Sequence, residues 1–214
     1  MKGRSGRSFP LKKKMTTRII LASASPRRRE LLAQAGIPFE VIPAQGEEKP
    51  GDLSPEETVR VLSLQKAAEV AESVADGGGD LSENLLVIGA DTVVSFRGEI
   101  LGKPRDRVDA ARMLRLLSGH RHEVWTGVTV IRMTPDGDRR EITFAEHTDV
   151  DVAELSEEEI GTYLSTGEAD DKAGAYGIQG RFGIHILSIR GDYNNVVGLP
   201  IASLYRVLRD SDLM

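Results

Sequence analysis

Residues 23–29 concentrate groups that bind phosphate. They read Ser-Ala-Ser-Pro-Arg-Arg-Arg and follow the apolar residues 19–22. A short strand that runs into a helix at the proline leaves free backbone N–H groups and the positive end of the helix dipole at one point. Each cation–phosphate pair there contributes about 4 kcal/mol at an effective dielectric near ~20, before desolvation. We predict that Ser23, Arg27 and Arg28 contact phosphate; a solvated helix start is the alternative.

An acid and a hydroxyl, Asp91 and Thr92, follow the apolar run 85–88 and a Gly-Ala pair. Sheets of α/β proteins place ligand-binding groups at the carboxyl ends of such strands. Neighbouring side chains on a regular strand face opposite sides. We therefore expect the strand to end or to bulge here if both residues serve one site. Capping of a simple turn is the alternative interpretation.

Two lysines are candidates for binding an anion. Lys66 shares a predicted helix face with Leu62 and Val70. It either extends outward along that face or points at an anion in a cleft. Lys103 lies in Gly-Lys-Pro, which lacks the spacing and the Ser/Thr of a P-loop, and an ordinary surface lysine is the alternative there.

A pair of acids, Glu47 and Glu48, follows the predicted strand 39–42 across a short turn. Two such acids are usually solvated loop charges. Together with Asp91, they offer the one or two carboxylates through which proteins normally hold Mg²⁺. The pattern therefore predicts a carboxylate metal site.

Residues 171–180 read Asp-Lys-Ala-Gly-Ala-Tyr-Gly-Ile-Gln-Gly. The glycines predict a tight loop whose backbone approaches a ligand closely. The Gln179 amide supplies a donor and an acceptor that match O4 and N3–H of a pyrimidine. A structural turn is the alternative, although the loop is unusually polar for one.

Strands and helices that alternate along the chain must position these groups. Capping boxes predict helix starts at Ser54 and Ser156, and Pro135-Asp136-Gly137 predicts a hairpin turn. The expected strands cover residues 18–22, 39–42, 85–88, 92–96, 99–101, 124–133, 141–152 and 184–189. The expected helices cover residues 26–35, 55–74, 106–119, 156–166 and 200–208. This order predicts an α/β fold with a mixed twisted β-sheet flanked by helices.

Composition narrows the class of protein. The 214 residues carry a net charge of −5 and no cysteine, which excludes disulfides and Cys-based zinc sites and fits a cytoplasmic location. No apolar run reaches the ~18 residues of a membrane span. The first 18 residues hold seven basic and no acidic side chains, so the remainder is acidic, which disfavours nucleic-acid binding. We predict a basic, disordered leader over residues 1–17 and one catalytic domain over residues 18–210; a transit-like segment, or an upstream start with Met15 as the working initiator, are the alternatives for the leader. The closely spaced His120 and His122 are assigned to a turn rather than to a metal.

Seven segments occur in the order found in the Maf family of nucleoside-triphosphate pyrophosphatases, which the chain resembles from residue 19 to residue 208. They are residues 21–28, 47–48, 65–67, 89–93, 102–104, 171–180 and 197–200. The resemblance implies a Maf/Ham1, ITPase-like fold, a homodimer and hydrolysis between the α- and β-phosphates of a nucleoside triphosphate. The loop 171–180 is similar to that of the dTTP/UTP branch, whereas the 7-methyl-GTP branch has an acid where Gln179 stands.

By the same resemblance, Arg27, Thr92 and Gln179 stand at specificity positions, and Asp91 stands at that of the proton acceptor. The complete predicted substrate-binding set is Ser23, Arg27, Arg28, Thr92, Lys172 and Gln179. The predicted catalytic set is Asp91, Lys103 and Lys66. The predicted ligands of a divalent metal, Mg²⁺ or Mn²⁺, are Glu48 and Asp91.

The function expected from these residues is hydrolysis of dTTP and UTP to the monophosphate and diphosphate. Water attacks the α-phosphorus while nearby cations neutralise charge on the leaving diphosphate. Two alternatives stay open. One is a regulatory nucleotide- or nucleic-acid-binding protein, suggested by the family's link to septum formation. The other is a pyrophosphatase for non-standard nucleotides such as 7-methyl-GTP.

Overall fold

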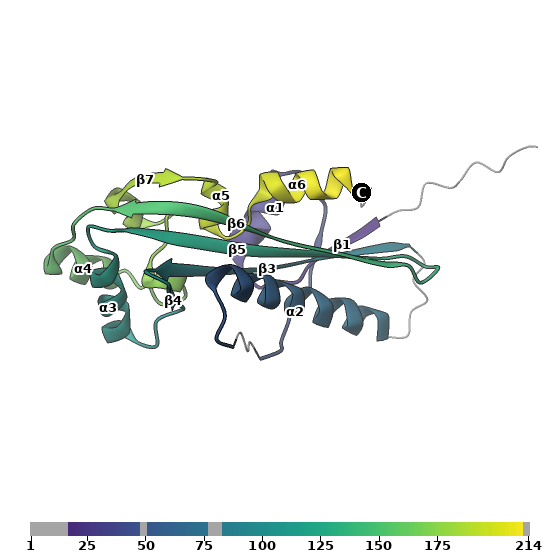
Figure 1. Cartoon of the computed structure of the whole chain (residues 1–214), viewed down its shortest axis with the longest axis horizontal. Helices are drawn as coiled ribbons and strands as arrows, with labels where there is room; N and C mark the ends of the chain where they lie inside the picture. The colour runs from purple at the N-terminus through teal and green to yellow at the C-terminus, as the bar shows by residue number, and fades with distance from the viewer. Residues whose placement is uncertain (1–16, 48–50, 77–82, 212–214) are drawn as a thin grey trace, which may run out of the picture.

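The computed structural model describes residues 17–47, 51–76 and 83–211 (Figure 1). The strands are β1 (Thr17–Leu21), β2 (Glu40–Val41), β3 (Asn84–Phe96), β4 (Glu99–Leu101), β5 (Arg121–Met133), β6 (Arg139–Val152) and β7 (Ile186–Arg190). The α-helices are α1 (Pro26–Gln34), α2 (Pro55–Asp76), α3 (Arg107–Leu117), α4 (Glu157–Leu164), α5 (Tyr193–Val197) and α6 (Ile201–Asp210). Two short 3₁₀ turns, η1 (Ala173–Ala175) and η2 (Arg181–His185), precede β7. The predicted leader lies outside the described residues except for Thr17, which begins β1.

The strands form one seven-stranded mixed sheet in the order β2-β1-β3-β5-β6-β7, with β4 beside β3. β1 runs parallel to β2 and β3, whereas all the other pairings are antiparallel. The helices lie along the long sheet (Figure 1). The predicted fold class is confirmed. None of the helices in the described part of the chain is long and apolar enough to cross a membrane.

Strand β3 is continuous, and this corrects two expectations. Its register with β5 runs from Leu85 opposite Met133 to Ser95 opposite Glu123 without a shift. The prediction of separate strands over 85–88 and 92–96, and of an end or bulge at Asp91–Thr92, is therefore wrong. The glycine within this run marks close approach of another backbone, not the end of the strand. A Cβ on Gly89 would lie 2.4 Å from the carbonyl oxygen of Ser63 on α2.

Helix α2 packs directly on one face of the sheet, which we call the α2 face. Apolar side chains of β1, β3 and β5 meet it there; the buried members are Ile20, Ala22, Ala67, Val70, Ala71, Leu85, Val87 and Ile131. A second glycine, Gly127 on β5, makes the close packing possible, because a Cβ there would lie 2.1 Å from the carbonyl oxygen of Val59. The two glycines thus allow α2 to lie close to the strands.

Two separate apolar clusters cover the opposite face of the sheet. Near β1, the helices α1 and α6 bury Leu31, Leu32, Leu204 and Leu208 against the strands. At the other end, α3 and α4 bury Leu114, Leu117, Ile160 and Tyr163 against β3, β5 and β6. Helix α5 was not predicted: it is a short helix capped by the side chain of Asp192, which accepts from the Asn194 N–H. The predicted late strand 184–189 begins instead at Ile186, after η2.

The sheet has a gap along one edge of β3. β1 pairs with β3 only as far as Ile88, and β4 pairs with it only from Val94 onward. Within the described residues, positions 89–93 therefore have no strand partner on that side. Side chains from both faces of β3 can reach this opening.

Candidate active site

The gap opens into a cleft of about 850 Å³, a volume within the ordinary range for small-molecule sites. Its walls come from the segment 22–28, one side of α2, the middle of β3 and the loops near residues 102, 171–180 and 196–198. Nine predicted site residues line it: Ser23, Arg27, Arg28, Lys66, Asp91, Thr92, Lys103, Lys172 and Gln179. Glu48 lies outside the described residues. The chemical roles given to all these side chains remain predictions.

A charged pair stands on the α2 face of the cleft. Lys66 Nζ donates to Asp91 Oδ1 at 2.5 Å, and the two side chains are only 17% and 10% exposed. Of the two orientations considered for Lys66, the one toward an anion is therefore correct, and the anion it meets within the protein is Asp91. A carboxylate removed from water in this way needs a cation close to it.

Arg28 forms the corresponding centre on the opposite face. Its guanidinium donates to the carbonyl oxygens of Ala90 and Gly198 and to the hydroxyls of Ser23 and Thr92, at 2.8–3.1 Å. It joins α1, β3 and the turn after α5, which lie far apart in the sequence. These bonds give Arg28 a role in holding the cleft together, beside its predicted contact with phosphate.

Asp91 and Thr92 do face opposite sides of the sheet, since one meets Lys66 and the other meets Arg28. Both nevertheless line the same cleft. The missing strand explains this, because an unpaired edge can be approached from above and below the sheet. The expectation that both residues need a strand end or a bulge overlooked this arrangement.

The start of α1 differs in detail from its prediction. Ser25 has the extended backbone of an N-cap, but its side chain makes no capping hydrogen bond; its N–H donates to Ser23 Oγ instead. Arg27 points across to the loop, where Nη1 lies 3.9 Å from Asp171 Oδ2. The hydrogen bond from Lys172, with a smaller contribution from Arg27, lowers the pKa of Asp171 below its ordinary value. This end of the cleft is thus rich in cations.

The loop 171–180 is tied down at several points. Lys172 Nζ donates to Asp171 Oδ1 and to the Glu168 carbonyl oxygen, both at 2.6 Å. The Gly174 N–H donates to the carbonyl oxygen of Gly102 at 3.1 Å, so the loop lies against the segment that carries Lys103. Gln179 is exposed at the end of the loop. The predicted tight loop at a ligand cleft matches this geometry.

Two tyrosines, Tyr163 from α4 and Tyr176 within the loop, make contacts that sequence reasoning did not predict. Tyr163 Oη accepts from the Gly177 N–H at 3.2 Å, and the Tyr176 hydroxyl lies 2.7 Å from His122 Nε2. Burial lowers the pKa of His122 to about 4 and raises that of Tyr163 to about 12. The interpretation of His122 as something other than a metal ligand agrees with this contact. The turn assignment does not, because His122 lies within β5.

The segment before the acidic pair is anchored by α2. Glu69 accepts from the backbone N–H groups of Gln45 and Gly46, and Gln65 donates to the carbonyl oxygen of Glu47 at 2.8 Å. Both anchors lie within one turn of Lys66. Glu69 was also missed, although its position three residues after Lys66 places it on a neighbouring part of the helix surface.

Comparison with known proteins agrees with this geometry. Residues 18–211 match the model of the family described as Maf-like protein. The chain is 54% identical over 198 residues to a dTTP/UTP pyrophosphatase of Agathobacter rectalis, covering 90% of this chain and 97% of that protein. It is 49% identical over 197 residues to a dTTP/UTP pyrophosphatase of Bacillus cereus, covering 92% and 96%.

A solved structure of a HAM1 protein from Coxiella burnetii aligns with a TM-score of 0.46 and 13% identity, over 91% of this chain and 100% of that chain. The family assignment does not depend on that looser likeness. The family model spans nearly the whole described chain, and the relatives near 50% identity extend over almost their full lengths. The chain belongs to the Maf family.

Proposed function

We propose that this protein is a nucleoside triphosphate pyrophosphatase that hydrolyses dTTP and UTP to the monophosphate and diphosphate. The observation that carries the proposal is the Asp91–Lys66 pair inside a cleft that also gathers Arg27 and Lys103. A carboxylate that can accept a proton, beside several cations that can bind phosphate, suits the attack of water on a polyanionic substrate. The relatives named dTTP/UTP pyrophosphatase supply the substrate class.

In the proposed reaction, water attacks the α-phosphorus and loses a proton to Asp91. A new P–O bond forms, the α–β anhydride bond breaks, and its electron pair leaves with diphosphate. Lys66, Lys103 and Arg27 neutralise the charge that develops on that leaving group, an electrostatic contribution that is often the largest single term in catalysis. Because Lys66 already binds one oxygen of Asp91, it also holds this carboxylate toward the cleft.

A divalent cation fits the donor set of the cleft. Asp91 offers a hard carboxylate oxygen to the cleft, the kind of ligand that Mg²⁺ and Mn²⁺ prefer. We propose that Asp91 and Glu48 hold this ion. When bound, it would supply Lewis-acid polarisation of phosphate oxygens. Glu69 and Gln65 hold the preceding segment 45–47 against α2.

Selection of the base is assigned to the exposed end of the loop 171–180. The Gln179 amide can donate to O4 and accept from N3–H of thymine or uracil. Thr92 and Arg27 border the same cleft from β3 and α1. Thymine or uracil is therefore the proposed base; cytosine and adenine carry the opposite donor and acceptor pattern, and guanine and hypoxanthine carry the matching pair farther from the ribose.

The experiment is diphosphate release from a panel of dTTP, UTP, CTP, ITP, 7-methyl-GTP and methylated uridine triphosphates with Mg²⁺ or Mn²⁺. We expect dTTP and UTP to be preferred, and Asp91→Asn to lower kcat by about 10²–10⁴-fold, the range for loss of a general base. Glu123→Gln, which changes a carboxylate outside the cleft, is the matched control and should retain activity. Equal turnover by Asp91→Asn would contradict the role of Asp91, and a strong purine preference would contradict that of Gln179.

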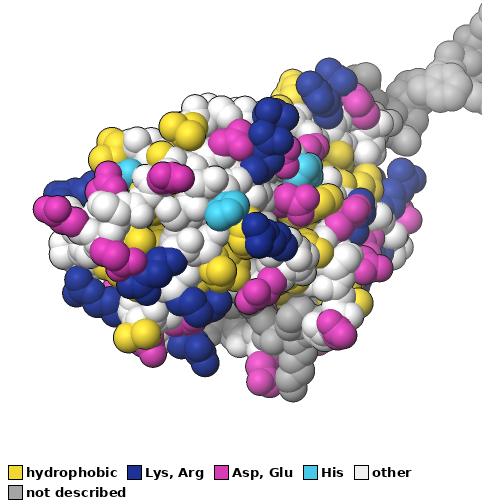
Figure 2. All heavy atoms as spheres, turned by 60° about the vertical axis from the view of Figure 1, so that its left-hand side comes forward, with side chains coloured by type: hydrophobic (Ala, Val, Ile, Leu, Met, Phe, Trp, Pro, Cys, Tyr) yellow, Lys and Arg dark blue, Asp and Glu magenta, His cyan; other side chains and the backbone are white. Residues whose placement is uncertain are grey.

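The same assay separates catalysis from regulatory binding, since nucleotide binding without turnover would contradict the proposal. We also propose a cytoplasmic homodimer that does not bind nucleic acid. Nucleoside triphosphates are cytoplasmic metabolites, and the net charge of −5 disfavours a polyanionic partner. On the face in view in Figure 2, Lys and Arg side chains are interspersed with Asp and Glu. Light scattering of the purified chain tests the dimer.

A further inference from the structure

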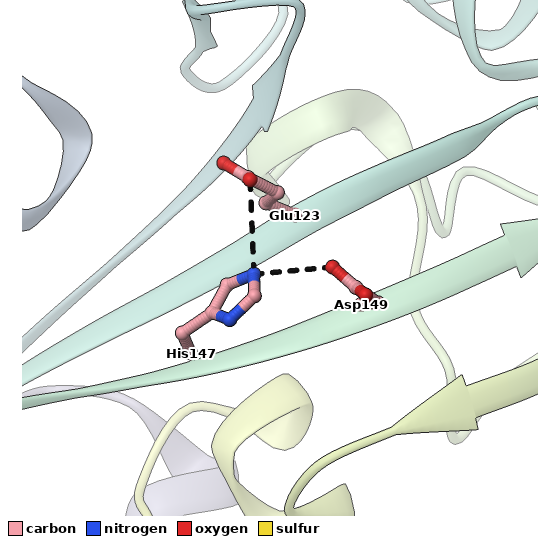
Figure 3. A group of neighbouring side chains, drawn as sticks. All are labelled: Glu123, His147 and Asp149. Atoms are coloured by element: carbon pink, nitrogen blue, oxygen red, sulfur yellow. Dashed lines mark ion pairs between the residues drawn. The ribbon is translucent and has the colours of Figure 1, made fainter.

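Three side chains converge on the α2 face away from the cleft: Glu123 from β5 and His147 and Asp149 from β6 (Figure 3). One potential ligand atom from each lies within 4.8 Å of the others. His147 Nε2 is 3.1 Å from Asp149 Oδ1 and 3.8 Å from Glu123 Oε1. We call these residues the β5–β6 cluster. None of them lines the cleft described above.

The cluster brings two carboxylates unusually close. Glu123 and Asp149 are direct cross-strand partners, and like charges at such positions destabilise a sheet. His147 lies closer to one of these two carboxylates than to the other. Its Nε2 is within hydrogen-bond distance of Asp149, but 3.8 Å from Glu123 is beyond that distance. A cation seated between the three groups would contact both carboxylates.

Neighbouring side chains hold the cluster in place. The Trp125 Nε1–H donates to Glu123 Oε2 at 3.1 Å, so the other oxygen of that carboxylate is the one near His147. The indole also packs on the imidazole, with ring centroids 4.7 Å apart. Hydrogen bonds and packing that orient ligand side chains in this way are typical of metal sites.

A buried hydroxyl adjoins the cluster independently of its charges. Ser95 on β3 is the cross-strand partner of Glu123 and therefore projects from the same face of the sheet. Its side chain is 1% exposed, and its Oγ has no hydrogen-bond partner in the described part of the chain. Such a group is costly unless something satisfies it. A hydrated cation beside Glu123 would bring a polar partner toward Ser95, which stands opposite Glu123 on the same face.

Two cations flank the cluster. Arg121 donates to Asp151 at 2.8 Å, and Arg190 is the cross-strand partner of Asp149 from β7. One imidazole nitrogen with two carboxylate oxygens suits Zn²⁺ and similar transition metals more than Mg²⁺ or Ca²⁺. Ligand distances near ~2.0–2.2 Å require only a small contraction of the cluster, and its side chains are partly exposed and able to move.

We propose that Glu123, His147 and Asp149 form a binding site for a Zn²⁺-class divalent cation, with water completing the coordination. The site joins β5 to β6 and is separate from the ion of the proposed reaction. Glu123 stands opposite Ser95, four residues along β3 from Asp91, which corresponds to about 13 Å along the strand. The bound ion would stabilise the folded sheet.

Calorimetric titration of the tag-free full chain with Zn²⁺ tests this site, in excess Mg²⁺ and on an Asp91→Asn background that weakens the cleft as a competitor. We expect one Zn²⁺ per chain and a rise in Tm on binding. His147→Ala should lower the affinity at least about tenfold, since even the loss of a supporting residue commonly costs that much. His120→Ala is the matched control, because it removes an exposed histidine whose Nδ1 contacts the Ser118 carbonyl oxygen instead.

Zn X-ray absorption should show one imidazole nitrogen among the ligands, and this signal should disappear in His147→Ala. Absence of Zn²⁺ uptake would overturn the proposal and leave the cluster as an ion pair only. Uptake that His147→Ala leaves unchanged would also overturn it. Neither readout uses nucleotide hydrolysis, so the result stands apart from the success or failure of the proposed function.

Discussion

The two faces of β3 place different cations in the cleft. On the α2 face, Lys66 donates to the carboxylate of Asp91. On the opposite face, Arg28 donates to two hydroxyls, one of them that of Thr92, and to two backbone carbonyl oxygens. The first cation is paired with a carboxylate; a polyanion can take the place of Asp91 at Lys66, and a metal ion can take the place of Lys66 at Asp91. The hydrogen bonds described for the second reach neutral oxygens of three separate segments. Two cations in one cleft are therefore suited to different tasks, one to chemistry and the other to geometry.

The histidines of β5 and β6 repeat this contrast. His122 is buried on the opposite face, where its Nε2 meets the Tyr176 hydroxyl and burial holds its pKa near about 4. His147 is partly exposed on the α2 face between two carboxylates. The buried histidine thus has a neutral partner, whereas the partly exposed histidine has two charged ones.

Among the variants that test this comparison of the two faces, the largest expected effect belongs to Lys66. Lys66→Met should lower kcat for dTTP by about 10²–10³-fold, as for the loss of one electrostatic donor. It should also lower stability, because Asp91 is left charged without this cation. The double variant Lys66→Met with Asp91→Asn should regain stability but not activity. Urea unfolding and steady-state kinetics of the two variants measure this. Recovery of activity together with stability would show that the pair is only structural.

Lowering the pH should reduce the stability of the folded protein through His122, which lies on the opposite face. Its folded pKa of about 4 lies below the ordinary value of 6.5 because burial disfavours the imidazolium. The unfolded chain therefore binds this proton first, so the associated stability is complete above pH 6.5 and is lost as the pH falls toward 4. The shift corresponds to about 3 kcal/mol.

Urea unfolding between pH 7 and pH 4 measures that loss. His122→Gln keeps a polar group beside Tyr176 but cannot titrate, so its free energy of unfolding should fall less steeply with acid than that of the wild type. Parallel curves, separated only by a constant offset, would contradict the buried neutral histidine, because the offset would then reflect packing alone.

Local patterns in the sequence predicted most of the elements and most of the cleft residues, because caps, apolar runs and clustered cations are local signals. The gap in the sheet was not predictable in this way. It depends on where β1 stops pairing and β4 begins, and thus on contacts between segments tens of residues apart. The predicted strand stopped at residue 88, whereas it continues through Gly89, which admits the backbone of α2.

The polar contacts beneath the cleft show the same limit. His122 and Tyr176 are 54 positions apart, and Arg28 and Gly198 are 170 apart. The sequence spacing of neither pair predicts a contact. The motif at 197–200 could be noted only through resemblance, and the structure gives its glycine a physical task, since the Gly198 carbonyl oxygen accepts from Arg28.

The smallest expected effect compares two buried threonines of β5 that face opposite ways. On the face of Arg28, Thr92 lies 3.0 Å from Thr126, whose hydroxyl donates to the Asn195 carbonyl oxygen. On the α2 face, Thr129 lies 3.0 Å from Ser63 Oγ. Thr126→Val and Thr129→Val should each lower the free energy of unfolding by about 1–3 kcal/mol, because each leaves buried polar atoms without a partner.

Only Thr126→Val should raise KM for dTTP, since it alone disturbs the chain of hydrogen bonds through Thr92 to Arg28. Its kcat should stay close to that of the wild type, because this network does not include Asp91. Equal KM values in the two variants would show that the network around Arg28 supports the fold without shaping the cleft. A selective rise in KM would indicate that the face of Arg28 shapes the cleft for substrate binding, whereas the face of Lys66 carries the catalytic groups.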